Sequence, residues 1–113
     1  MHITVLKSKI SYAKITHTEL YYEGSITIDE AIMEAAGLQP FEQVHVVNLS
    51  NGERLVTYVI TGARNSGIIG LNGPAARKGL IGDDVHILSY AQTDPKHSID
   101  PKVVALKRGL NRL

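Results

Sequence analysis

Residues 44–61 read VHVVNLSNGERLVTYVIT, and this stretch decides the fold class. Residues 44–49 are rich in β-branched side chains that alternate with others, and residues 53–61 repeat the pattern after a break. Such alternation is typical of half-buried strands, and Asn51-Gly52 is a pair that favours the positive φ angles of a tight turn. The stretch therefore predicts a β-hairpin that turns at Asn51-Gly52.

Short strand patterns continue on both sides of this hairpin. They cover residues 1–18, as one or two half-buried strands, then residues 68–71 and 85–90, with an edge strand at 103–106. Thr27 and Glu30 have the spacing of a capping box, which predicts a short helix over residues 31–36 that stops at Gly37. Residues 75–78 predict one more helical turn.

The fold class follows from the number and length of these segments. Six or so short strands with one clear helix favour a closed or nearly closed β-barrel over a layered α/β sheet. A chain of 113 residues suits one core, so we expect a single, mainly β domain over residues 1–113 with one or two short helices. The basic C-terminal end is expected to be loose.

Composition narrows the function classes. The net charge is only +1, with 12 basic and 11 acidic residues, so we expect no nucleic-acid partner. No apolar run reaches the roughly 18 residues of a membrane span, and the first ten residues do not form a signal peptide, so we expect a cytoplasmic protein without a membrane partner. The chain has no Cys, which excludes disulfides, a thiolate nucleophile and Cys-based metal sites.

Familiar site patterns do not occur in the sequence. The five histidines are scattered without ligand spacing, so we expect no metal site; they are His2, His17, His45, His86 and His97. Residues 62–73 contain glycines but neither a dinucleotide-binding nor a Walker pattern.

The pair Gly24-Ser25 is informative only in its context. At average usage a Gly-Ser pair occurs by chance in about half of chains this long, and alone it indicates a turn between a strand and a helix. Around it, however, stand five blocks in a fixed order. They are Lys9; Tyr22-x-Gly24-Ser25 with Thr27-Ile28-Asp29; Asn51-Gly52-x-Arg54-x-x-Thr57-Tyr58; Asn72-Gly73 with Ala75-Ala76; and Gly82-Asp83. In these blocks the chain resembles the aspartate 1-decarboxylase family over nearly its whole length.

The resemblance implies a double-psi β-barrel that assembles as a homotetramer with active sites between subunits. It implies a proenzyme that cuts itself between Gly24 and Ser25, giving residues 1–24 and 25–113. Ser25 would thereby become a covalent pyruvoyl cofactor, which forms a Schiff base with the substrate. The implied reaction removes the α-carboxylate of L-aspartate to give β-alanine and CO2 for pantothenate synthesis.

The resemblance also implies a role for each matching residue. Thr57 would stabilise the oxyanion during self-cleavage and later contact the substrate, and Tyr58 would return the proton. Arg54 and Lys9 would hold the carboxylate that remains. The other substrate-binding positions implied are Asn72, Gly73, Pro74 and Ala75. Where the family has Ala, this chain has Pro74, which lacks a backbone N–H, and where it often has His, this chain has Ser11.

Two other interpretations stay open at this point. In one, the chain is a non-catalytic β-barrel binding module in which Gly24-Ser25 is only a turn. In the other, it is a member of the same family that acts on a different acidic amino acid. The first predicts an intact chain, whereas self-cleavage predicts two fragments.

Overall fold

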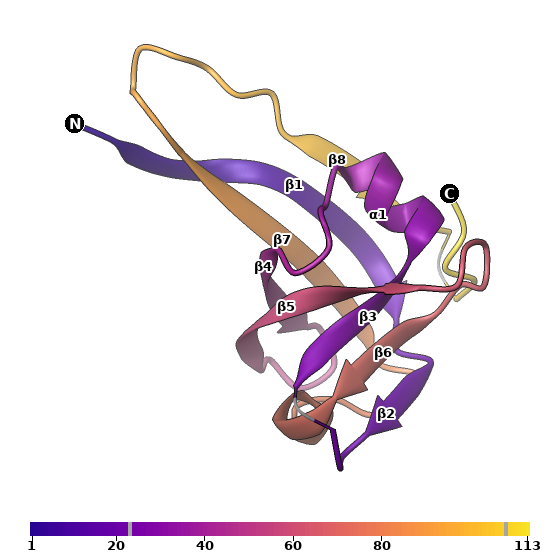
Figure 1. Cartoon of the computed structure of the whole chain (residues 1–113). Coiled ribbons are helices and arrows are strands. Elements are labelled where there is room, and N and C mark those ends of the chain that lie inside the picture. Colours follow the sequence, from indigo (N-terminus) through magenta and orange to yellow (C-terminus); the bar gives the residue numbers. More distant parts are fainter. Residues whose placement is uncertain (23, 108) are drawn as a thin grey trace.

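A computed structural model describes residues 1–22, 24–107 and 109–113, so Glu23, beside the Gly-Ser pair, lies outside the described residues. The described part of the chain forms one eight-stranded sheet with one α-helix and one 3-10 helix (Figure 1). In chain order the elements are β1 (Ile3–Lys14), β2 (His17–Glu19), β3 (Ser25–Asp29), α1 (Glu30–Ala36), β4 (Gln43–Asn48), β5 (Arg54–Gly62), β6 (Ile69–Asn72), η1 (Gly73–Arg77), β7 (Asp84–Thr93) and β8 (Lys102–Ala105). The mainly β prediction is confirmed.

The sheet closes on itself through the N-terminal part of the chain. Its strand order is β2-β6-β3-β5-β4-β7-β1-β8, so β1 and β2 lie near opposite ends although only two residues separate them. Those residues bridge the gap, because Ile15 N–H donates to the Asp83 carbonyl at 2.9 Å and Thr16 N–H donates to the Ile69 carbonyl at 2.8 Å. Three strand pairs are parallel, β1 with β8, β2 with β6 and β3 with β5, and the others are antiparallel.

The core fills the inside of this curved sheet. Alternate residues of each central strand point inward, as in β4, where Val44 and Val46 are buried and their neighbours are partly exposed. Ile26 and Ile28 of β3 are fully buried in the same cluster. Each such side chain contributes about 1.5–3 kcal/mol when buried, so this alternation places Ser25, Thr27 and Asp29 together on the opposite face of β3.

The predicted hairpin is present, but its turn is not the tight two-residue kind. β4 ends at Asn48 and β5 begins at Arg54, and only Gly52 of the predicted pair has a positive φ, at 75°. The longer loop is held by side chains, since the Asn48 Oδ1 accepts from Ser50 N–H and the Asn51 Oδ1 accepts from Glu53 N–H. These side-chain bonds replace the geometry expected from Asn51-Gly52 alone.

The predicted helix is also present, but the capping box at Thr27 is wrong. Thr27 lies in β3, and the N-cap is Asp29, whose carboxylate accepts from Ala31 N–H at 2.8 Å. Gly37 ends the helix in the left-handed conformation, with φ 69°, as predicted. Strand β3, which contains Thr27, pairs with both β5 and β6, and this pairing overrides the local capping signal.

The C-terminal end is not loose, contrary to expectation. Asn111 is buried, and its side chain bonds to the N–H and carbonyl of Lys14 and to the carbonyl of Gly67. The tail is therefore fastened to the end of β1. The helical turn predicted at residues 75–78 lies in η1, which begins earlier, at Gly73. No helix in the described part of the chain is long and apolar enough to cross a membrane.

Candidate active site

The Gly24-Ser25 pair lies where the chain enters β3. Ser25 is fully buried at the start of the strand, and Gly24 has a φ of 110°, which side chains of L-residues rarely allow. The backbone at this bond thus has a conformation that requires glycine. The buried hydroxyl of Ser25 needs a polar partner, because an unpaired buried hydroxyl is costly.

Asn72 supplies that partner from the neighbouring strand. Ser25 of β3 and Asn72 of β6 are directly opposite in the antiparallel ladder, and the Asn72 Nδ2 donates to the Ser25 Oγ at 2.9 Å. The same Nδ2 donates to the Thr27 Oγ1, also at 2.9 Å. Two hydroxyls of one strand are therefore joined by one amide of the next.

Gly73 allows η1 to lie against the segment that contains Gly24. It has a φ of 64°, and a Cβ at this position would lie 2.7 Å from the Gly24 nitrogen and 2.9 Å from the Gly24 Cα. No side chain fits there without moving the backbone of Gly24. The next residue, Pro74, lies beside Gly24 as well, its Cδ 3.6 Å from where a Gly24 Cβ would be.

A hollow of about 350 Å³ opens beside this segment. It brings together five of the residues that the sequence predicted, from three separate parts of the chain. Its lining consists of Gly24, Leu55, Val56, Thr57, Tyr58, Pro74, Ala75 and Lys78. The hollow thus places the hydroxyl-bearing residues Thr57 and Tyr58 beside Gly24. Hydroxyl groups of this kind can stabilise the oxyanion of an acyl shift and transfer a proton.

The two predicted cationic residues do not line this hollow. Arg54 lies on β5 and donates from its Nη2 to the Tyr90 hydroxyl at 2.9 Å, and the Tyr90 ring packs edge-on against His45 at 4.9 Å. Lys9 lies on β1, and strands β7 and β4 separate it from β5. Within one chain, neither Lys9 nor Arg54 therefore belongs to the lining of the Gly24 hollow, although Arg54 directly precedes Leu55, which does.

His86 lies on β7 near Lys9. Burial lowers the pKa of His86, the nearby positive charge of Lys9 lowers it further, and Asp84 opposes both effects. The ring is held by the N–H of Tyr12, which donates to its Nδ1 at 3.2 Å. The Nδ1 of His86 therefore serves as a hydrogen-bond acceptor. Across the described residues, no three His, Asp or Glu side chains gather closely enough to hold a metal ion.

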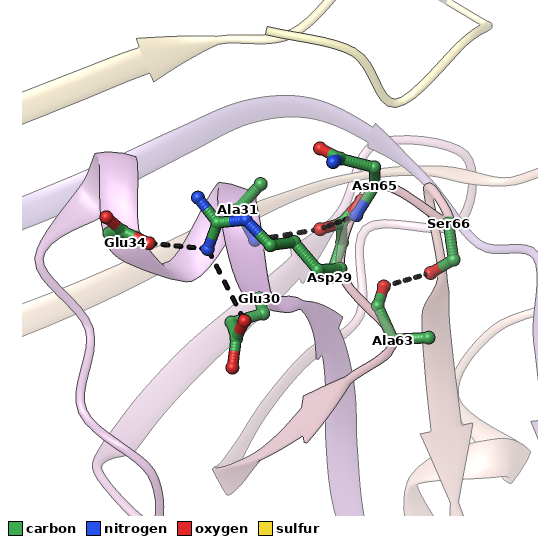
Figure 2. Close-up of polar contacts among 8 residues, drawn as sticks. Asp29, Glu30, Ala31, Glu34, Ala63, Asn65 and Ser66 are labelled. Atoms are coloured by element: carbon green, nitrogen blue, oxygen red, sulfur yellow. Dashed lines mark hydrogen bonds and ion pairs between the residues drawn. The ribbon is translucent and has the colours of Figure 1, made fainter.

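A second polar cluster occupies the other end of β3 (Figure 2). The buried Asp29 carboxylate accepts from Ala31 N–H at 2.8 Å, Asn65 N–H at 3.0 Å and Gly67 N–H at 2.8 Å. Burial acts to raise the pKa of Asp29, but these N–H groups together lower it below its ordinary value. Outside this carboxylate, Arg64 pairs with Glu34 at 2.6 Å and with Glu30 at 3.4 Å.

Two residues that bond to predicted site residues were not themselves predicted: Thr27, which bonds to Asn72, and Tyr90, which bonds to Arg54. Thr27 could have been found from the sequence, because it follows Ser25 by two positions and so shares its strand face. Tyr90 could not, because its contact with Arg54 depends on the register of three strands. Leu55, Val56 and Lys78 line the hollow without any signal in the sequence.

The strand order and the buried site define a small β-barrel, and comparison with solved structures specifies its type. A rationally designed double-psi β-barrel superposes with a TM-score of 0.51 at 20% identity, covering 68% of this chain and 90% of the design. A second such design has a TM-score of 0.51 at 17% identity, covering 77% and 96%. At these identities the likeness concerns the fold alone, and the predicted double-psi β-barrel is confirmed.

Sequence comparison then identifies the family. The model of the aspartate decarboxylase family matches residues 1–112. A protein of Coxiella burnetii named aspartate 1-decarboxylase is 68% identical over 108 residues, covering 95% of this chain and 97% of the relative. Relatives of the same name from Francisella tularensis subsp. holarctica and Leptospira biflexa are 60% identical (96% and 99% covered) and 52% identical (92% and 91% covered). The chain belongs to the aspartate decarboxylase family, a family of enzymes, as its sequence blocks predicted.

Proposed function

We propose that this protein removes the α-carboxylate of L-aspartate, giving β-alanine and CO2, by means of a pyruvoyl group that it makes from Ser25. The observation that carries the proposal is the fully buried Ser25 hydroxyl, bonded to Asn72 and adjoining a glycine with a φ of 110°. A turn with no chemical role would not need a fully buried hydroxyl next to its glycine. Family membership supports the same reaction.

The first step is self-cleavage between Gly24 and Ser25. The Ser25 Oγ bonds to the Gly24 carbonyl carbon, the peptide C–N bond breaks, and the hydroxyl proton passes to the released amine, leaving an ester. Loss of the Ser25 α-proton then breaks the Cβ–Oγ bond, which frees the Gly24 carboxylate and leaves a dehydroalanine. Water converts this residue to a pyruvoyl group and releases ammonia. We assign Thr57, which lines the hollow with Gly24, to stabilising the oxyanion of the first step.

The residues around Ser25 fit such a group. Gly73 leaves no side chain against Gly24, and the hollow adjoins the position where the new terminus would form. When formed, the pyruvoyl carbonyl supplies the electron sink for the carbon–carbon bond that breaks. The chain's own part is then to hold the substrate and return a proton. We assign proton return to the Tyr58 hydroxyl and substrate contacts to Thr57, Asn72 and the segment Gly73-Pro74-Ala75.

Arg54 and Lys9 would hold the surviving carboxylate, and their absence from the lining of the hollow within one chain supports a site shared between subunits. A guanidinium and an ammonium from a neighbouring copy could meet the Gly24 hollow of this chain. Val56 and Tyr58 are exposed on the outer face of β5, as an intersubunit surface would require. We therefore propose a homotetramer with intersubunit active sites. Its product would serve pantothenate synthesis in the cytoplasm.

Intact-mass spectrometry of the purified chain, followed during incubation, tests the proposal. We expect two fragments, residues 1–24 and residues 25–113, the second lighter by one ammonia than a fragment that begins with serine. An intact chain after prolonged incubation would instead favour the non-catalytic binding module, and a fragment with a plain serine terminus would contradict the formation of a pyruvoyl group.

Substrate assignment needs separate variants that mature normally. We expect Arg54→Ala to cleave itself but to lose aspartate turnover, with Arg54→Lys retaining part of it, because an ammonium cannot pair bidentately. Tyr58→Phe should bind aspartate and fail to turn it over. Faster turnover of glutamate than of aspartate by the unmodified protein would favour the other acidic substrate.

A further inference from the structure

We propose that Thr27 is a positioning residue for self-cleavage, because its hydroxyl fixes the Asn72 amide that holds the Ser25 hydroxyl. This inference rests on the proposed self-cleavage and adds to it a residue that does not touch the reacting atoms. It follows from one arrangement, in which a single amide nitrogen is shared between two hydroxyls of β3.

The Asn72 side-chain amide has two N–H bonds, and each has one partner. One partner is the Ser25 Oγ and the other is the Thr27 Oγ1, both at 2.9 Å from Nδ2. The terminal torsion of an Asn side chain is broad, so one contact alone would let the amide plane rotate. Two contacts on the same nitrogen fix the plane. The Thr27 hydroxyl is thus what prevents Asn72 from turning its donor away from Ser25.

Thr27 lies beside a glycine of each neighbouring strand. It lies directly opposite Gly70 of β6, where a Cβ would be 3.7 Å from its own Cβ. On the β5 side, a Cβ at Gly62 would be 2.9 Å from the Thr27 Cγ2 and 2.5 Å from the Ile68 Cγ2, so the threonine methyl and Ile68 share the space that this glycine leaves. A β-branched side chain has few rotamers, and with the methyl placed against Gly62 the hydroxyl remains directed at Asn72.

This orientation matters for the attack on Gly24. Because Asn72 donates, the Ser25 Oγ is the acceptor in that bond, and its own proton remains free to leave as the Oγ bonds to the Gly24 carbonyl carbon. The C–N bond breaks in the same acyl shift, and the proton ends on the nitrogen of residue 25. Rates of such intramolecular attacks fall steeply with small displacements of the nucleophile. A mobile Asn72 would therefore slow cleavage without preventing folding.

The experiment compares Thr27→Val, which has the same shape without the hydroxyl, with Thr27→Ser, which keeps the hydroxyl without the methyl. Each precursor is produced uncleaved at low temperature, and cleavage is followed by intact mass. We expect Thr27→Val to cleave roughly tenfold more slowly, the effect of one hydrogen bond, and Thr27→Ser to stay within about twofold of the unmodified chain. Hydroxylamine, which cuts the ester, should trap correspondingly less of the valine variant.

A double-mutant cycle separates positioning from a merely structural role. If Thr27 acts through Asn72, adding Thr27→Val to Asn72→Ala should slow cleavage no further, whereas independent effects would multiply. Melting temperatures serve as the folding control, and Thr27→Ala replaces the valine variant if that variant does not fold. Normal cleavage by the hydroxyl-free variants, or multiplying effects in the cycle, would overturn the inference. Failure of the unmodified chain to cleave would instead refute the proposed function.

Discussion

The two ends of β3 carry polar networks of opposite character on one strand face. At the start, the neutral hydroxyls of Ser25 and Thr27 share one amide from Asn72. At the end, the charged Asp29 accepts from three backbone N–H groups and is fully occupied as a helix cap and loop anchor. Both ends are buried, so burial alone does not distinguish a reactive position from a structural one.

The difference lies in what each group can still do. A carboxylate that is saturated by backbone donors is held by the fold and stabilises it, and its lowered pKa reflects that stabilisation. A hydroxyl that accepts one bond from a side chain keeps a proton and a lone pair. The hydrogen bonds from the main chain to Asp29 are thus typical of a structural role. The hydrogen bond from a side chain to Ser25 fits the proposed self-cleavage.

The largest expected effect is at Ser25. Ser25→Ala should abolish cleavage completely, because no other atom can form the ester, and the precursor should remain intact in a mass spectrum. The variant should fold, since a small buried side chain becomes smaller. Cleavage of Ser25→Ala at the same bond would contradict a reactive role for the Ser25 hydroxyl at the start of β3.

Asp29→Asn should show the opposite pattern. The neutral amide has one acceptor oxygen in place of two, and its NH2 group would face the backbone N–H groups that now donate to Asp29. We therefore expect a loss of about 1–3 kcal/mol in the free energy of unfolding. The folded fraction should still cleave at the normal rate. Denaturant unfolding of a Ser25→Ala background, which removes cleavage as a variable, measures the loss. A slower cleavage rate with unchanged stability would contradict the structural role of Asp29 and indicate a role in cleavage.

Acid should affect the Asp29 end and spare the Ser25 end. Because the pKa of Asp29 is lowered in the folded chain, its stabilisation is present above the ordinary pKa of about 3.9 and is lost as the pH falls through the folded value. Stability should therefore fall below about pH 4 in the unmodified chain, and this component should be missing in Asp29→Asn. Urea unfolding at pH 3 and pH 7 for both chains makes the comparison.

The smallest effect is expected at the exposed cation beside Asp29. Arg64 pairs with Glu30 and Glu34 at the surface, where solvent screens such pairs. Arg64→Ala should leave cleavage and the unfolding midpoint unchanged within error. A clear loss of stability would mean that the cap of α1 extends beyond the Asp29 carboxylate to its surface charges.

Much of this could be predicted from the sequence, for identifiable reasons. The alternation of side chains and the turn residues predicted the β fold. Gly37 predicted the end of the helix because glycine readily adopts the positive φ that it has there, 69°. The sequence blocks predicted the family. The capping box failed because Thr27 pairs with two strands, and the loose tail failed because Asn111 meets Lys14 from a distance of 97 residues along the chain. Such long-range contacts leave no local pattern.

If the chain cuts itself as proposed, the placement of β1 has a consequence for the cleaved protein. β1 lies between β7 and β8 and lines the core with Ile10 and Ala13, so the fragment of residues 1–24 is an internal part of the barrel. Once the bond at Gly24 is cut, only ladder bonds and packing retain that fragment. Unfolding then becomes a dissociation that obeys mass action, so its midpoint should rise with protein concentration even for a single barrel. The cut chain would thus behave as a two-component complex that was assembled while it was still one molecule.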